Sequence, residues 1–154
     1  MTVATQHLIA RVRASWIALP VRDLAEILRP LPLLEAPHDT LGGLVRGVAI
    51  VRGLATPVLD TARLVDGQPA TRVGHWLRVA VGPGRFVALE VERAERVVNH
   101  LEDAGAWPSL MGQDHPIARL MRYETALVAL LASSRILSEG AHAALVGTTR
   151  EARP

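Results

Sequence analysis

The chain has 154 residues, of which 49% are hydrophobic and 21% charged, a composition typical of a globular protein and not of a disordered one. Its formal net charge is only +2, and its basic residues, all arginine, form no run that could follow a phosphate backbone, so no nucleic-acid partner is expected. The sequence has no cysteine and no apolar run of the roughly 18 residues that a membrane-spanning helix needs. We therefore expect a cytoplasmic protein without disulfides, thiol chemistry or direct membrane insertion.

Short hydrophobic segments bounded by turn residues predict β-strands in the first half of the chain. The strands are expected at His7–Val12, Ser15–Leu19, Gly47–Val51 and Thr56–Leu59. The prolines and paired glycines of Pro30–Gly43 predict a loop between the second and third of these strands. Val65–Gly74 is the expected link to the second half, because it contains Gly67 and Pro69.

The second half predicts a similar series of elements. Its strands are expected at Trp76–Val81, Arg85–Val91, Ile117–Tyr123 and Ala126–Leu131. Gly82-Pro83-Gly84 predicts a hairpin turn between the first two of them. Ser133–Gly147 predicts a C-terminal helix that is interrupted at Gly140.

The segment Arg46–Asp60 is the most informative of the predicted hairpins. Gly53 permits the backbone angles of a tight turn, and Pro57, which cannot donate a ladder hydrogen bond, is expected at a strand's first residue or on an edge. The segment places no catalytic group. A hairpin with a charged, exposed turn at Arg52 favours contact with a partner over bond-breaking chemistry.

The two halves resemble each other at a constant offset of 70 residues. Trp16–Leu28 aligns with Phe86–Val98, and the same offset carries Val58 onto Val128. Chance similarity between apolar segments is the alternative, but a single offset over separated segments favours a duplicated architecture of two small β-barrels. We expect one domain over residues 1–154, with subdomains at about 14–68 and 74–132 and with the N-terminal strand and C-terminal helix completing the barrels.

No set of residues has the spacing of a catalytic or metal site. The six histidines lack the spacing of zinc ligands, and Ser133-Ser134 lacks the Gly-x-Ser-x-Gly context of a nucleophile. Glu90 and Glu92 would share one strand face, where solvated carboxylates are a better interpretation than an acid–base pair. The sequence therefore favours a protein that is not an enzyme.

Four segments of the first half carry a recognisable pattern. They are Ile17–Val21, Glu26–Pro30, Gly47–Gly53 and Pro57–Asp60. They resemble the segments ALPI, EIIRP, GVINLRG and PVIDL of the CheW-like family, the coupling proteins of bacterial chemosensory arrays, and Val87–Glu92 resembles the family's VGLLVD. The resemblance implies a mainly β fold of two intertwined, five-stranded, SH3-like barrel subdomains with short helices and a C-terminal helix.

The resemblance also implies a function and a set of contact residues. Members of the family are adaptors without cofactor that join the regulatory domain of a CheA-type histidine kinase to the cytoplasmic tips of chemoreceptors in membrane-associated arrays. The positions that resemble the receptor-facing groove are Leu24, Glu26, Gly47, Arg52 and Val97. The kinase-facing edge is expected on the strand that contains Ala55, Thr56, Val58 and Asp60.

The chain departs from the family pattern at a few places, which leaves two alternatives open. Ile50-Val51 replaces the Asn-Leu expected before the Arg-Gly turn, and the closing strand at Leu130-Leu131 lacks the expected aspartate. One alternative is a divergent adaptor of a non-flagellar sensory system that binds one of the two partners and does not couple the kinase. The other, supported only by arginines near glycine-rich turns, is a β-barrel that binds a nucleotide or another small ligand.

Overall fold

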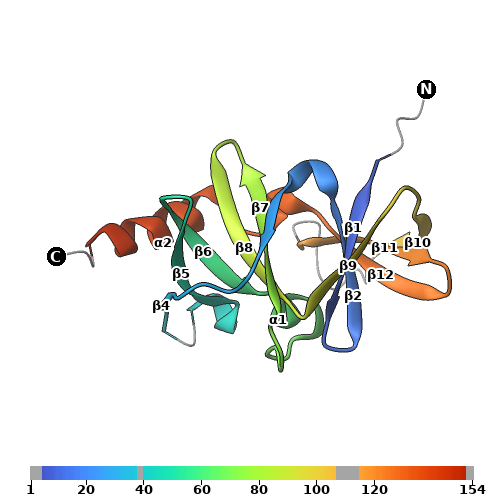
Figure 1. The fold of residues 1–154 in the computed structure, drawn as a ribbon, viewed down its shortest axis with the longest axis horizontal. Helices are drawn as coiled ribbons and strands as arrows, with labels where there is room; N and C mark the ends of the chain where they lie inside the picture. The colour runs from blue at the N-terminus through green and yellow to red at the C-terminus, as the bar shows by residue number, and fades with distance from the viewer. Residues whose placement is uncertain (1–4, 38–39, 107–114, 152–154) are drawn as a thin grey trace.

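The computed structural model describes residues 5–37, 40–106 and 115–151, which form two six-stranded β-sheets (Figure 1). Sheet 1 has the strand order β10-β11-β12-β2-β1-β9. Its strands are β1 (His7–Val12), β2 (Ser15–Pro20), β9 (Arg93–Val98), β10 (Glu102–Ala106), β11 (Ile117–Tyr123) and β12 (Ala126–Leu131). The mainly β architecture is thus confirmed.

Sheet 2 has the strand order β3-β7-β8-β6-β5-β4. Its strands are β3 (Leu24–Leu28), β4 (Leu34–Glu35), β5 (Val45–Val51), β6 (Leu54–Asp60), β7 (His75–Gly82) and β8 (Arg85–Val91). The helix α1 (Thr61–Asp66) follows β6, and α2 (Glu139–Glu151) packs against β5 and β6. Short 3-10 turns lie at Val21–Asp23, Thr40–Gly43 and Ser133–Arg135. None of the helices in the described residues has the length and apolarity that a membrane span requires.

The two sheets are built on one plan, and the halves of the chain exchange a hairpin between them. In sheet 1 the hairpin β1–β2 joins strands of the second half, because β2 runs parallel to β12 and β1 pairs with β9. In sheet 2 the hairpin β7–β8 joins strands of the first half, because β8 runs parallel to β6 and β7 pairs with β3. The sheets therefore do not follow the expected division at about residues 14–68 and 74–132.

The correspondence between the sheets extends to single residues. The offset of 70 relates Trp16 on β2 to Phe86 on β8, and the edge strands β3 and β9 carry a register shift at matching places, after Leu24 and after Ala94. The hairpins β5–β6 and β11–β12 correspond with a separation of 72, so that Val58 matches Leu130. The predicted duplication is present, with a slip of two residues in the second hairpin.

All eight predicted strands are present, but shorter elements went unpredicted. β3, β4, β9 and β10 have two to six residues, most of them half-buried or exposed, and no helix was predicted at α1. The C-terminal helix begins at Glu139, where the Ser138 hydroxyl accepts a hydrogen bond from the Ala141 N–H at 3.1 Å. The predicted interruption at Gly140 was wrong, because the break precedes the helix.

Hydrophobic side chains of both sheets form the main core between them. Leu8 and Ile17 from sheet 1 pack in the same cluster as Leu77 and Leu89 from sheet 2. A second, smaller cluster fills the other face of sheet 2, where Trp76 packs with Ala49, Val51, Val58 and Ala88. Sheet 2 is therefore covered on both faces by apolar packing.

The second cluster contains a buried carboxylate, Glu90, only 4% exposed. Its Oε2 accepts a hydrogen bond from the Trp76 indole N–H at 3.3 Å, and Arg46 Nε lies 3.9 Å from its Oε1. Burial raises the pKa of Glu90 above its ordinary value of 4.5, although Arg46 and Trp76 act in the opposite direction. Glu90 therefore binds its proton more tightly in the folded state than in the unfolded chain.

Replacing Glu90 with glutamine should stabilise the protein at pH 7 and have little effect near pH 4. A raised folded-state pKa gives the wild type a stabilising contribution below the unfolded-state pKa, and this contribution is lost as the pH rises through the folded-state value. Glutamine keeps an acceptor for Trp76 and carries no charge. Urea denaturation of both proteins at the two pH values measures the difference, and a difference that does not grow with pH would show that the carboxyl is ionised without cost.

Candidate partner-binding site

Glu26 on β3 and Arg52 in the β5–β6 turn form an ion pair on the surface of sheet 2. Arg52 Nε lies 3.0 Å from Glu26 Oε2 and 3.3 Å from Oε1. The Arg52 side chain is 71% exposed, whereas that of Glu26 is 24% exposed. The contact ties the edge strand β3 to a hairpin whose strands are three and four positions away in the sheet order, so the sheet curls toward a barrel.

The turn itself explains how Arg52 is presented. Arg52 and Gly53 have φ angles of 53° and 77°, the left-handed pair that a tight two-residue hairpin requires. Glycine adopts this region without strain, as the sequence predicted for Gly53. The turn directs the arginine away from the core and toward β3, where Glu26 holds it.

The other three residues expected in the receptor-facing groove have different surroundings. Leu24 is half-buried and packs against the main core. Gly47 lies where β5 meets β4, and a Cβ there would stand 2.2 Å from the Leu34 carbonyl oxygen. Val97 is on β9 of sheet 1 and is 51% exposed. Gly47 is thus needed for strand pairing, and of the two apolar residues Val97 alone is largely exposed.

The residues expected on the kinase-facing edge are mostly buried, which corrects that expectation. β6 lies between β5 and β8 and is not an edge strand. Thr56, Val58 and Asp60 are at most 1% exposed, and Ala55 is half-buried. Asp60 instead accepts hydrogen bonds from the N–H groups of Arg63 and Ala70, at 3.3 and 3.1 Å. These three side chains stabilise the fold and present nothing to a partner.

Sheet 1 has residues of opposite charge at the two positions that correspond to Glu26 and Arg52, but these two residues do not form an ion pair. Arg96 on β9 matches Glu26 on β3, since both lie just after the register shift of their edge strands. Glu124 in the β11–β12 turn matches Arg52, and its φ of 54° is nearly the same. Arg96 donates a hydrogen bond to the Tyr123 hydroxyl at 3.2 Å. The site formed by Arg96, Tyr123 and Glu124 was not predicted from the sequence, although the offset of 70 between Glu26 and Arg96 indicates it.

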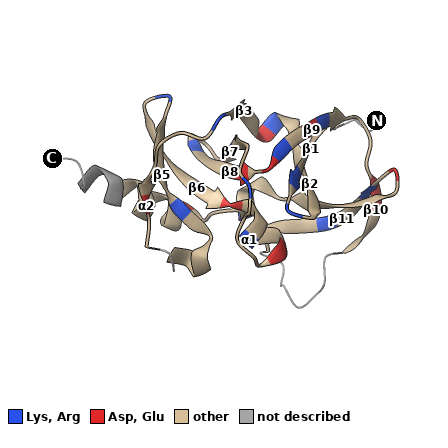
Figure 2. Ribbon diagram, turned by 60° about the horizontal axis from the view of Figure 1, so that its bottom comes forward, with Lys and Arg blue, Asp and Glu red and all other residues tan. Residues whose placement is uncertain are grey.

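Charged residues are otherwise interspersed over both sheets, as Figure 2 shows by the alternation of blue and red segments. A hollow of about 530 Å³ lies between the sheets, where β2, β7 and β12 contribute residues such as Pro20, Ala80 and Leu130. At its rim the Ser133 hydroxyl donates a hydrogen bond to Asp23 Oδ2 at 2.9 Å. Among the described residues no group of three metal-ligating side chains is present.

The fold defines a mainly β domain made of two intertwined sheets that share a core, and on each sheet a side chain of an edge strand bonds to a residue of the neighbouring hairpin, Glu26 to Arg52 and Arg96 to Tyr123. The family model of the CheW-like domain matches residues 6–141, so the chain belongs to that family. The resemblance found in the sequence motifs is confirmed. No curated protein sequence matches the chain.

A solved structure has a similar fold. It is the scaffolding protein TtCheW from Thermoanaerobacter tengcongensis, which superimposes with a TM-score of 0.73 over 94% of this chain and 96% of that chain. The two sequences are 13% identical. At this level of identity the likeness concerns the fold.

Proposed function

We propose that this protein is a non-catalytic adaptor that couples chemoreceptors to a CheA-type histidine kinase in a bacterial chemosensory array. The match of the CheW-like domain to residues 6–141 carries this proposal. The similarity of the fold to a protein described as a scaffold supports it. The protein requires no cofactor in this function, and we place it in the cytoplasm beside membrane-associated receptors.

We propose that the receptor contact includes Arg52, Glu26 and Val97. Arg52 and Val97 are exposed, and Arg52 is held in place by Glu26, so little side-chain freedom is lost when a partner binds. A guanidinium with one side on a carboxylate keeps further N–H groups for charge-assisted bonds to an acidic or carbonyl group on a receptor helix.

The purified protein should bind both a CheA-type kinase regulatory domain and a receptor cytoplasmic fragment from its own organism. In a reconstituted assay it should raise receptor-dependent autophosphorylation of the kinase. Binding to one partner without stimulation would favour the alternative of an adaptor that does not couple the kinase. Binding to neither partner at low salt would contradict both.

Replacing Arg52 with glutamate should weaken binding to the receptor fragment by roughly tenfold, about 1.4 kcal/mol. The change removes the cation and places two carboxylates side by side at the rim. The thermal midpoint should shift little, because an exposed ion pair contributes about 1 kcal/mol or less to stability. Titration calorimetry and a thermal melt measure the two effects.

Arg122→Glu is the matched control for this substitution. The Arg122 side chain is 50% exposed, and its Nη1 lies 3.9 Å from Glu102 Oε2 on sheet 1. Its replacement therefore also breaks a surface ion pair. It should leave receptor binding unchanged. Equal loss in both variants would mean that net charge, not the Arg52 contact, governs binding. A large fall in the thermal midpoint of Arg52→Glu alone would mean that Arg52 is structural.

A further inference from the structure

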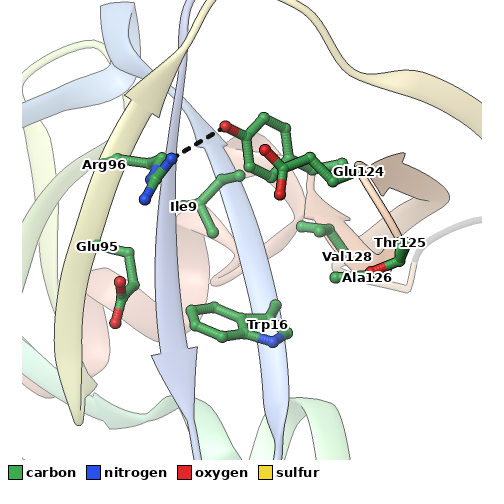
Figure 3. A pocket seen from close by; sticks show the side chains of 9 residues that line it. Ile9, Trp16, Glu95, Arg96, Glu124, Thr125, Ala126 and Val128 are labelled. Carbon is green, nitrogen blue, oxygen red and sulfur yellow. Dashed lines mark hydrogen bonds between the residues drawn. The ribbon is translucent and has the colours of Figure 1, made fainter.

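An open pocket of about 190 Å³ lies on sheet 1, between β9 and the β11–β12 turn (Figure 3). Its wall is formed by Trp16, Ile9 and Val128, and its charged rim by Arg96, Glu95 and Glu124. Pockets for drug-sized ligands measure about 300–1,000 Å³, whereas a cavity of about 150 Å³ holds one benzene ring. The pocket therefore has room for one flat group of the size of a single side-chain head.

Sheet 2 shows what fills the matching place there. Arg78 on β7 occupies the position that Ile9 has on β1. Arg78 is paired with Ala88 and Glu26 on the neighbouring strands. Ile9 is paired with the counterparts of these residues, Ala18 and Arg96. Its guanidinium lies 4.0 Å from the centroid of the Phe86 ring, and the residue is 9% exposed. In sheet 1 the shorter Ile9 leaves the space beside Trp16, the counterpart of Phe86, open. Both subdomains thus have an arginine beside the aromatic ring, but in sheet 1 it is Arg11, and the place that corresponds to Arg78 holds the shorter Ile9.

The rim carries charges of both signs, and one of its carboxylates has no ion-pair partner in the part of the chain that the structure describes. Glu95 pairs with Arg93, outside the pocket, and Arg96 is bonded to the Tyr123 hydroxyl. The pKa of Arg96 is raised by that hydrogen bond first and also by the nearby carboxylates of Glu124 and Glu95. Glu124 itself accepts no hydrogen bond and has no ion-pair partner within 4.0 Å among the described residues, whereas its counterpart Arg52 is paired with Glu26. One carboxylate at the opening is thus available for a new partner.

The indole ring of Trp16 is the second group in the pocket that can contact a guanidinium. Arg11 already lies 4.9 Å from its ring centroid, which shows that this indole accepts a guanidinium as a neighbour. Arg11 does not line the pocket, so the part of the indole that does remains accessible. Figure 3 shows Trp16 on one side of the space and Arg96 with Glu124 on the other.

We propose that this pocket binds the guanidinium of an arginine side chain from a protein partner, stacked on Trp16 and paired with Glu124. Arginine, tryptophan and tyrosine are the residues most often found at the energetic centre of protein interfaces. The site lies on sheet 1 and does not use Arg52 or Glu26. It adds a contact to those proposed above, and it does not depend on the identity of the receptor or the kinase.

The test is a two-dimensional NMR titration of the full-length, ¹⁵N-labelled protein with N-acetyl-arginine amide. We expect saturable shifts of the Trp16 indole N–H and of the Thr125 and Ala126 amides. N-acetyl-citrulline amide, which has the same shape without the charge, should bind on the order of tenfold more weakly, because it lacks both the cation–π contact and the ion pair. A Trp16→Phe variant identifies the indole signal among the three tryptophans.

Two variants separate the role of Glu124 from general charge effects. Glu124→Gln should weaken binding of the arginine probe by about two- to fivefold. Glu139→Gln, which removes a carboxylate that is 79% exposed on α2, should change nothing. Equal binding of the citrulline probe, stronger binding of N-acetyl-aspartate amide, or no shift at Trp16 with any probe at tens of millimolar would each overturn the proposal. Failure to bind a receptor or kinase would leave this result unaffected.

Discussion

Replacing Trp76 with alanine should lower the free energy of unfolding by about 3–5 kcal/mol, the usual cost of removing a large aromatic side chain from a core. Trp76 is 1% exposed and is the largest residue of the second, smaller hydrophobic cluster, which packs on the face of sheet 2 that is turned away from the main core. Its loss would also deprive the buried Glu90 carboxylate of its indole hydrogen bond. Urea denaturation followed by far-ultraviolet circular dichroism measures the change.

Trp76→Phe is the control that separates volume from hydrogen bonding. It keeps most of the ring and loses the N–H donor, so we expect a loss of about 1–2 kcal/mol. A loss below about 1 kcal/mol for the alanine variant would contradict the assignment of this cluster as a packed core.

Replacing Asp60 with alanine should cost about 2–3 kcal/mol, because two backbone N–H groups would lose their acceptor in a buried place. One belongs to Arg63 in the first turn of α1 and the other to Ala70 in the link that follows. Asp60 is 1% exposed, so water cannot substitute for the carboxylate. Thermal and urea denaturation measure the loss.

Asp60→Asn and Asp66→Ala complete this experiment. Asparagine keeps one acceptor oxygen and should recover about half of the lost stability. Asp66 is surface-exposed in part and accepts a hydrogen bond from the Ser15 hydroxyl at 2.6 Å, so its removal should cost less than Asp60→Ala. If Asp60→Asn weakened kinase binding while the protein kept its full stability, the buried, structural role assigned to Asp60 would be wrong.

The strands that were predicted from the sequence are those whose pattern is local. β1, β8 and β11 are continuous segments of six or seven residues that are rich in hydrophobic side chains. β3 alternates half-buried and exposed residues over five positions, because successive side chains of a strand point to opposite faces of the sheet. Such a segment carries the same apolar pattern as a short amphipathic turn, and only its pairing with β7 makes it a strand.

The exchange of hairpins could not be predicted, because the sequence repeat gives two similar halves and does not say which half each hairpin pairs with. The same limit applies to the candidate site. Glu26 and Arg52 were each identified from motifs, but their contact depends on the curl of sheet 2. Thr56 and Val58 were assigned to a kinase-facing edge from the family resemblance, whereas β6 lies inside the sheet.

The placement of the strands along the chain also sets the order in which the protein can form on the ribosome. Sheet 2 uses a contiguous stretch, from Leu24 to Val91, and can pair completely as soon as that stretch has emerged. Sheet 1 is complete only when the chain has been synthesised as far as Leu131, where β12 ends. At 5–20 residues per second, this is about 2–8 seconds after Val91 has been added. During that interval the hairpin β1–β2 can dock on sheet 2 through the shared core and can pair with β9, but β2 still lacks its partner β12. The pairing of β2 is therefore completed only after sheet 2 has formed, although β2 precedes every strand of that sheet in the sequence.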